Sequence, residues 1–115
     1  MSKANRCTYE GTKSPFNFEI MDSGGELSYA KKLDGDESVL AWTKKHNVAI
    51  RYRNSKGGIS RYIHDFIVRR KKQAHLELVE IKGGHLRHDP NIDLKIKAAE
   101  DWCRQRGMKY IFIEV

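Results

Sequence analysis

The chain has 115 residues and a formal net charge of +7, with 39% hydrophobic and 32% charged residues. Such a chain forms one domain with a small core, and its composition excludes the collagen-like, linker-like and disordered classes. No apolar run approaches the roughly 18 residues that span a membrane, and no signal peptide is visible. We therefore expect a cytoplasmic protein with no membrane partner, whose cysteines, Cys7 and Cys103, are reduced thiols.

The first part of the chain predicts an arm followed by two helices. Residues 1–22 show little periodicity, so we expect an irregular N-terminal arm with a short strand at 16–20. Apolar residues at helical spacing predict a first helix over 26–33 and a second over 39–47. The run Asp34-Gly35-Asp36 predicts a turn between them and an N-cap for the second helix.

The remainder predicts three strands, a helix and a fourth strand, over residues 48–53, 59–69, 76–82, 92–103 and 110–113. Short turns between the first three strands favour an antiparallel meander, and the helix before the last strand allows a parallel crossover. Gly107 is suited to end that helix. The sequence therefore predicts an α/β (α+β) fold, a mixed four-to-five-stranded sheet flanked by helices, over a main domain at 23–115.

The positive charge is concentrated in the middle of the chain. Residues 41–75 carry ten basic side chains and one acidic one, Asp65, whereas 1–40 has a net charge of −2 and 76–115 a net charge of zero. A localised basic field favours a polyanion, most often nucleic acid, and the alternative is a solvated face. As a group, the best candidates for contacts with phosphate are Arg51, Arg53, Arg61, Arg69, Arg70, Lys71 and Lys72.

Two carboxylates and a lysine form the candidate chemical site. Asp65 lies among apolar residues of the second predicted strand, where a carboxylate needs a cation or strong donors. Glu80 and Lys82 point the same way from the third strand, and Glu77 faces the opposite way as a cross-strand charge partner. If these strands pair, Asp65 and Glu80 approach each other, and with the Ile81 carbonyl they suit a hard divalent cation. Lys82 beside them would orient a water or neutralise a phosphorane.

These motifs resemble the PD-(D/E)xK nuclease signature, through the runs Tyr62-Ile63-His64-Asp65-Phe66-Ile67-Val68 and Leu78-Val79-Glu80-Ile81-Lys82-Gly83. Flanking patterns also resemble it, namely Glu26-x-x-Tyr29-Ala30, Val39-x-x-Trp42 and Lys95-x-x-x-Ala99-x-x-Trp102. Over residues 23–115 the chain is similar to the endonuclease subunit of heteromeric transposases and to the nuclease domain of type III restriction enzymes. His64 departs from the proline usual in this family, which shapes the strand and does no chemistry.

The resemblance implies a restriction-endonuclease-like αβββαβ core and a DNA endonuclease that uses Mg²⁺, with Mn²⁺ as a substitute. It implies that Asp65 and Glu80 bind the metal and that Lys82 acts on the attacking water or the scissile phosphate. Glu26 would contribute from the upstream helix to catalysis and to the metal site, and Lys95 would flank the site and contact nucleic acid. DNA is the expected partner, and the compact basic chain is typical of phage or mobile-element enzymes.

The sequence leaves several alternatives open. The same fold could serve as a non-catalytic nucleic-acid-binding module, as an RNase or as a structure-specific junction nuclease. A homodimer, or a larger recombination or restriction complex, would supply the second strand cut or base specificity. His85 and His88 suggest zinc, but two further ligands at suitable spacing are missing, so a polar loop is the better interpretation.

Overall fold

The computed structural model describes residues 6–63, 66–82 and 90–115. In these described residues, two helices and eight strands follow one another in this order: β1 (Cys7–Tyr9), β2 (Glu19–Met21), α1 (Gly24–Gly35), β3 (Val39–Thr43), β4 (Ala49–Arg53), β5 (Ile59–Ile63), β6 (Phe66–Arg70), β7 (Leu76–Lys82), α2 (Pro90–Gln105) and β8 (Lys109–Glu114).

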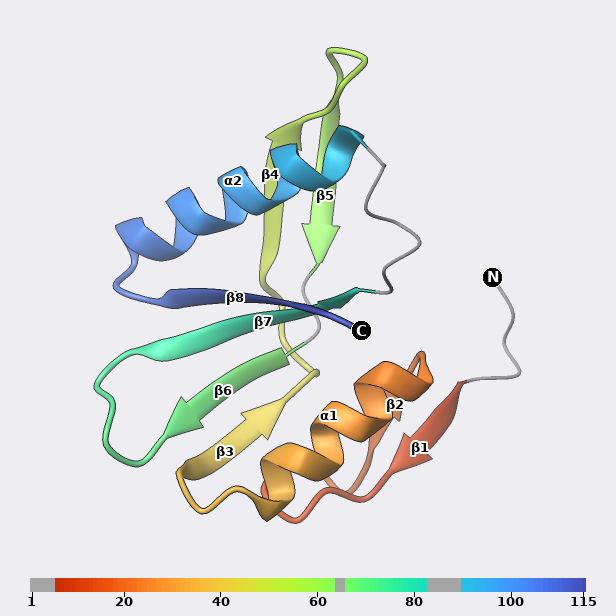
Figure 1. The fold of residues 1–115 in the computed structure, drawn as a ribbon, viewed down its shortest axis with the longest axis vertical. Coiled ribbons are helices and arrows are strands. Elements are labelled where there is room, and N and C mark those ends of the chain that lie inside the picture. Colours follow the sequence, from red (N-terminus) through yellow and green to blue (C-terminus); the bar gives the residue numbers. More distant parts are fainter. Residues whose placement is uncertain (1–5, 64–65, 83–89) are drawn as a thin grey trace.

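The central sheet has four strands in the order β3-β6-β7-β8 (Figure 1). The β3–β6 and β6–β7 pairs are antiparallel, whereas β7 and β8 are parallel and are joined through α2. In chain order, α1, β3, β6, β7, α2 and β8 make up the αβββαβ core that the family resemblance implied. The β4–β5 hairpin is a separate two-stranded sheet inserted between β3 and β6, and β1–β2 is another. The mixed α+β class is therefore confirmed.

One predicted helix is wrong, because residues 39–43 form strand β3 rather than the start of a helix over 39–47. The register of β3 against β6 shifts between Val39 and Ala41, which marks a β-bulge or a similar irregularity. An extra residue in a strand lets positions three apart share a face. Val39 and Trp42 are accordingly both buried, at a spacing that is also helical. Asp36 caps the C-terminus of α1 instead of starting a second helix.

The strand predicted over 59–69 is also wrong as a single element. It is divided into β5, which pairs with β4 in the hairpin, and β6, which pairs with β3 and β7 in the central sheet. The first of the three core strands is therefore β3 and not the predicted strand at 48–53. The predicted strand at 76–82 is confirmed with the same bounds as β7, and the predicted helix and last strand are confirmed as α2 and β8, which extend by two residues and one residue at each end.

Local signals set the ends of both helices. Ser23 is the N-cap of α1, and its hydroxyl accepts a hydrogen bond from the Glu26 amide at 3.1 Å. At the end of α2, Gly107 adopts a φ of +67°, and Met108 N donates to the Cys103 carbonyl at 2.8 Å. This is a Schellman-type ending, which a residue without Cβ favours, and it turns the chain directly into β8.

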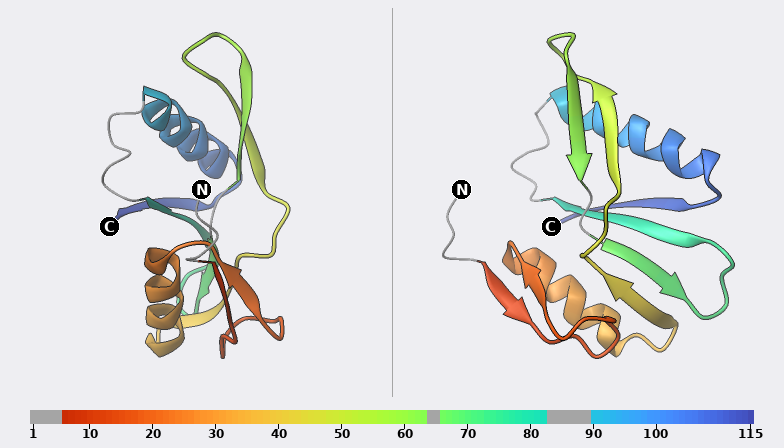
Figure 2. Two further views of the ribbon diagram at one scale, coloured as in Figure 1. Left: turned by 90° about the vertical axis from the view of Figure 1, so that its right-hand side faces the viewer. Right: turned by 180° about the vertical axis from the view of Figure 1, so that it is seen from behind.

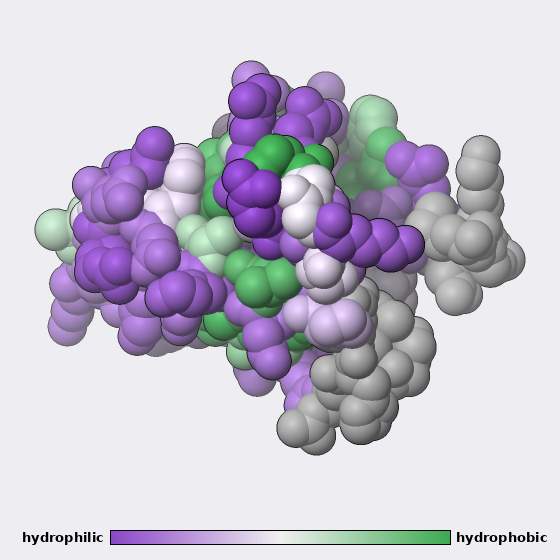
Figure 3. Space-filling view, turned by 90° about the horizontal axis from the view of Figure 1, so that it is seen from above, coloured by the Kyte–Doolittle hydropathy of each residue, from purple (hydrophilic) through white to green (hydrophobic). Residues whose placement is uncertain are grey.

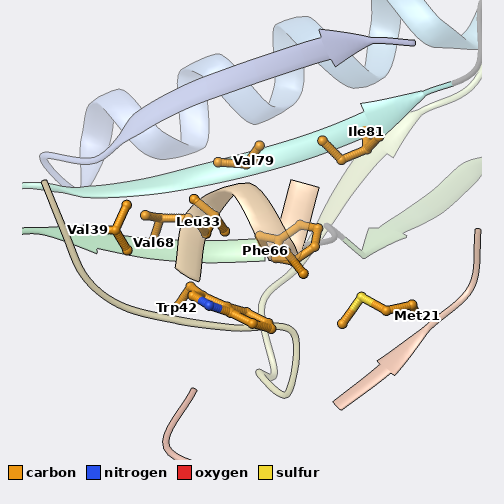
Figure 4. Packing of buried hydrophobic residues seen from close by; sticks show 9 residues of the cluster. Met21, Leu33, Val39, Trp42, Phe66, Val68, Val79 and Ile81 are labelled. Carbon is orange, nitrogen blue, oxygen red and sulfur yellow. The ribbon is translucent and has the colours of Figure 1, made fainter. Parts of the chain in front are cut away.

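The two helices cover opposite faces of the sheet. On one face, α1 buries Ala30 and Leu33 against a cluster that includes Trp42, Phe66 and Val79 (Figure 4). On the other face, α2 packs Ala99 and Cys103 against Leu78 of β7 and Ile50 of β4, so the hairpin shares this second core. Figures 1 and 2 show α2 and the hairpin on one side of the strands, and α1 with β1 and β2 on the other.

The Asp34 carboxylate connects the N-terminal segment to the hydrophobic cluster beneath α1 through hydrogen bonds. Asp34 Oδ2 accepts from the Tyr9 hydroxyl at 2.6 Å, and Asp34 Oδ1 accepts from Trp42 Nε1 at 2.8 Å. The amides of Thr12 and Lys13 donate to the same side chain. The short strand expected at 16–20 overlaps only the start of β2 (Glu19–Met21), which pairs with β1, a strand in the segment that was expected to be an irregular arm.

Candidate functional site

The carboxyl end of β7 brings together Glu80 and Lys82. Side chains of a strand alternate between its faces, so both point to the face that α2 and the hairpin cover. Glu80 is only 2% exposed, and Lys82 Nζ lies 3.2 Å from Glu80 Oε2. A carboxylate so deeply buried needs a positive partner, and here that partner comes from the same strand. The predicted convergence of Glu80 and Lys82 is therefore present in the fold.

An aromatic side chain from the hairpin closes the other side of this pair. Tyr62 of β5 is buried, and its ring centroid lies 6.0 Å from Lys82 Nζ and 5.3 Å from Lys95 Nζ. Burial raises the pKa of Tyr62 well above its ordinary value, and the nearby Glu80 carboxylate and Tyr110 hydroxyl raise it further. Tyr62 thus stays protonated and neutral beside Glu80 across the physiological pH range.

Glu26 occupies a different environment. It is 7% exposed at the start of α1, where its carboxylate accepts from the Asp22 amide at 2.8 Å and forms a close ion pair with Lys44. Lys44 Nζ also donates to the Ile20 carbonyl at 2.8 Å. The structure therefore brings Glu26 together with Lys44 and Asp22, and it does not bring it into contact with Glu80 or Lys82.

Asp65, the other predicted metal ligand, lies outside the described residues, as do His64, Gly83, Gly84, His85 and His88. The described ladder between β6 and β7 ends at the pair Phe66 and Val79, the residues next in sequence to Asp65 and Glu80. Ile81, whose carbonyl was expected to bind metal, lies between Glu80 and Lys82 in β7 with its side chain in the α1 core. Across residues 6–63, 66–82 and 90–115, no group of three or more His, Cys, Asp or Glu side chains forms a metal cluster.

The predicted basic residues divide into three groups. Arg51, Arg53 and Arg61 are exposed on the hairpin, where the ladder places Arg51 directly opposite Arg61. No acidic partner within the described part of the chain neutralises this pair. Like charges opposed across a ladder are destabilising. Figure 3, a view from the hairpin side, shows a largely hydrophilic face with small apolar patches.

The second group is Arg69, near the end of β6, with Lys71 and Lys72 in the turn between β6 and β7, and all three are exposed. Lys71 and Lys72 line an open hollow of about 940 Å³ at this turn. Arg70 differs from them, because it is engaged by Glu77 at 3.0 Å, by Asp36 at 3.2 Å and by the Ser38 hydroxyl at 2.6 Å. Glu77 is thus the predicted cross-strand charge partner, and Arg70 has a structural role.

The third group is Lys95 alone, on α2 beside the Glu80–Lys82 pair. In the described residues it has no acidic partner, and its contact there is the Tyr62 ring. The family resemblance implied that Lys95 flanks the site, and the structure places it over the Tyr62 ring. Sequence reasoning did not single out Tyr62 or Lys44. Tyr62 belongs to the run that resembles the nuclease signature. Its place beside Lys82 and Lys95 depends on the hairpin, which the sequence prediction did not separate from β6. No sequence pattern singles out Lys44.

A family described as TnsA-like endonuclease N-terminal matches residues 36–114, more than half of the chain. The chain belongs to this family. The match covers β3 to β8, including Glu80, Lys82, Lys95 and the hairpin, and it leaves α1 with Glu26 outside. A comparison with curated proteins finds no match. No helix in the described part of the chain is long and apolar enough to cross a membrane. The predicted nuclease family is thus confirmed.

Proposed function

We propose that this protein is a metal-dependent DNA endonuclease that hydrolyses phosphodiester bonds at the carboxyl end of β7. The observation that carries the proposal is the buried Glu80–Lys82 pair, since a carboxylate and an ammonium are held there on a rigid strand within an endonuclease family domain. A purely structural ion pair at a strand end gains little from such burial, because desolvation costs as much as the attraction returns.

The residues at this point suit a hard divalent cation. Asp65, Glu80 and the Ile81 carbonyl would supply only oxygen donors, which Mg²⁺ and Mn²⁺ prefer. Asp65 directly precedes Phe66, whose partner Val79 directly precedes Glu80, which favours the joint use of the two acids. Glu26 is left out of this donor set because Lys44 already neutralises it. When bound, the metal would lower the pKa of a water and stabilise charge on the phosphoryl oxygens.

The chain's own residues prepare the site for hydrolysis. Lys82 is 24% exposed in its side chain, so its ammonium can contact Glu80 and still reach a water or a phosphate oxygen. The buried Tyr62 ring excludes bulk water from one side of the pair and strengthens its electrostatics. In the reaction, the water oxygen forms a bond to phosphorus, the ester P–O bond breaks, and the products are a phosphate end and a hydroxyl end.

Positive side chains outside the centre supply the contacts with DNA in this proposal. The exposed arginines of the hairpin and the exposed cations of the β6–β7 turn have no structural acidic partner in the described residues, unlike Arg70. Such side chains neutralise backbone phosphates irrespective of sequence. Base specificity and the second strand cut would then come from partners, in a heteromeric recombination complex or in a homodimer.

The test is cleavage of supercoiled plasmid, single-stranded DNA, branched DNA and RNA with Mg²⁺, Mn²⁺ or EDTA. Wild type is compared with Lys82→Ala and with Lys97→Ala, which removes an exposed cation of α2. We expect metal-dependent DNA cleavage that Lys82→Ala abolishes and Lys97→Ala retains, with all three proteins folded. Binding that persists in EDTA with no cleavage of any substrate would instead identify a nucleic-acid-binding module.

A further inference from the structure

Tyr62 lies where the hairpin, β7 and α2 meet, and its ring packs against another residue of the hairpin. The ladder pairs it with Ile50, and the Tyr52 ring packs edge-on against it at 6.5 Å between centroids and 75° between planes. Only 5% of Tyr62 is exposed. The hairpin thus carries one buried aromatic ring, packed against its own Tyr52, to the carboxyl end of β7.

Two ammonium groups from two other elements contact this ring. Lys82 of β7 and Lys95 of α2 lie 6.0 and 5.3 Å from its centroid, within the range of a cation–π interaction. Lysine side chains lose considerable rotamer freedom when they are fixed. A shared aromatic contact reduces this cost at the time of binding, since both ammonium groups are already confined.

Among the described residues, the charges around the Tyr62 ring do not balance. Glu80 neutralises Lys82, with which it is in contact at 3.2 Å, whereas Lys95 has no acidic partner in this part of the chain. Within residues 6–63, 66–82 and 90–115, the positive charge of Lys95 is therefore left beside a buried pair. A phosphodiester carries one negative charge per phosphate and has the oxygens that an ammonium contacts.

We propose that Tyr62 is a positioning residue that holds Lys95 beside the Glu80–Lys82 pair, so that Lys95 binds a backbone phosphate at the centre. The inference rests on the proposed function for the identity of the ligand, a DNA backbone. The ring, rather than the hydroxyl, does this work, because both lysines are placed over the aromatic system.

The experiment measures binding of a fluorescent DNA duplex at several salt concentrations in EDTA, where no cleavage occurs. The slope of log K against log[salt] is negative, and loss of one phosphate contact lowers its magnitude by about 0.9. We expect that decrease for Lys95→Ala and for Tyr62→Leu. The double variant should lose about 0.9 once rather than twice, since both changes remove the same contact. Tyr62→Phe should recover the wild-type slope, and Lys97→Ala on the same helix is the matched control.

Each other outcome overturns the positioning role. Additive losses in the double variant would show that Tyr62 and Lys95 act separately, and an unchanged slope in Lys95→Ala would remove the phosphate contact. A slope for Tyr62→Phe as low as for Tyr62→Leu would assign the effect to the hydroxyl. If Tyr62→Leu unfolds, Lys95→Ala still tests the phosphate contact through the salt slope. Tyr62→Phe then still tests the role of the hydroxyl, since the proposal requires it to bind DNA as wild type does. A wild type that shows the expected cycle but cuts no DNA would refute the nuclease proposal alone.

Discussion

Strand β7 carries two buried glutamates on opposite faces, and their surroundings differ. Glu77 faces α1 and meets the Arg70 guanidinium at 3.0 Å, which is itself held by Asp36 and Ser38. Glu80 faces α2 and meets the Lys82 ammonium at the end of the strand, next to Tyr62. Guanidinium forms fixed, directional bonds, whereas an ammonium is a mobile point charge. The comparison indicates that Glu77 stabilises the fold, whereas Glu80 is the carboxylate that the proposed function assigns to the reacting centre.

The largest expected effect comes from Glu80→Gln. In the proposed nuclease it should lower the rate of DNA cleavage by about 1,000-fold, the size expected when a preorganised charge at the reacting centre is removed. The free energy of unfolding should fall by about 2 kcal/mol, as for Glu77→Gln below, because both carboxylates are 3% exposed and their cations are 21% and 24% exposed. The cleavage rate is therefore the measurement that separates the two glutamates. Plasmid cleavage and urea unfolding measure the two effects. A loss of stability with cleavage intact would make Glu80 structural.

Glu77→Gln is the matched change and should act on stability alone. Removal of one partner from a fully buried ion pair costs about 3–5 kcal/mol. We expect about 2 kcal/mol here, since Arg70 is 21% exposed and keeps Asp36. The same urea experiment measures it, with the cleavage rate per folded molecule unchanged. If Glu77→Gln abolished cleavage without lowering stability, the division between the two faces would be wrong.

A third carboxylate extends the comparison to a site held by hydrogen bonds. Burial alone would raise the pKa of Asp34, but hydrogen bonds from Tyr9, Trp42 and two amides lower it below 3.8. The bond to Asp34 also raises the pKa of Tyr9 to about 12. Tyr9→Phe should therefore lower the free energy of unfolding by about 1 kcal/mol, and Thr8→Val on the exposed part of β1 is its control.

The pH dependence of that difference follows from the two shifts. A lowered pKa stabilises the fold above 3.8 and loses this effect as pH falls through the folded value. A raised pKa stabilises it below 10 and loses this effect as pH rises through about 12. Between these limits, the free energy of unfolding of wild type should exceed that of Tyr9→Phe by a constant amount. Outside them, the two free energies should converge. Thermal melting across pH checks this, and a difference that persists at both extremes would contradict it.

Much of the fold follows from sequence, and the failures have physical causes. The α1 and α2 patterns, the Gly107 ending and the β7–α2–β8 crossover could all be predicted because their signals are local. Strand β3 could not, since its irregular register gives Val39 and Trp42 a helical spacing. The boundary between β5 and β6 could not either, because His64-Asp65 stands between Ile63 and Phe66 without the Gly or Pro that would signal the end of a strand.

The candidate site shows the same limit. Glu80 and Lys82 could be placed together from the alternation of one strand. The contact between Tyr62 and Lys95 could not be predicted from sequence, because it depends on how the hairpin and α2 pack against β7. Glu26 was expected at the centre from the family resemblance, but the structure pairs it with Lys44, a residue that no pattern singled out.

The smallest expected effect concerns the opposed arginines of the hairpin, and it tests whether this surface is kept for a polyanion. Arg51→Gln should raise the free energy of unfolding by about 0.3 kcal/mol, because it relieves the repulsion from Arg61 across the ladder. It should also lower the salt slope of DNA binding by about 0.9, through loss of one phosphate contact. Lys31→Gln, an exposed cation on α1, is the control and should change neither quantity. A gain in stability together with weaker DNA binding would mean that the opposed arginines destabilise the fold and contribute to DNA binding. A loss of stability with an unchanged slope would make the hairpin arginines a solvated face.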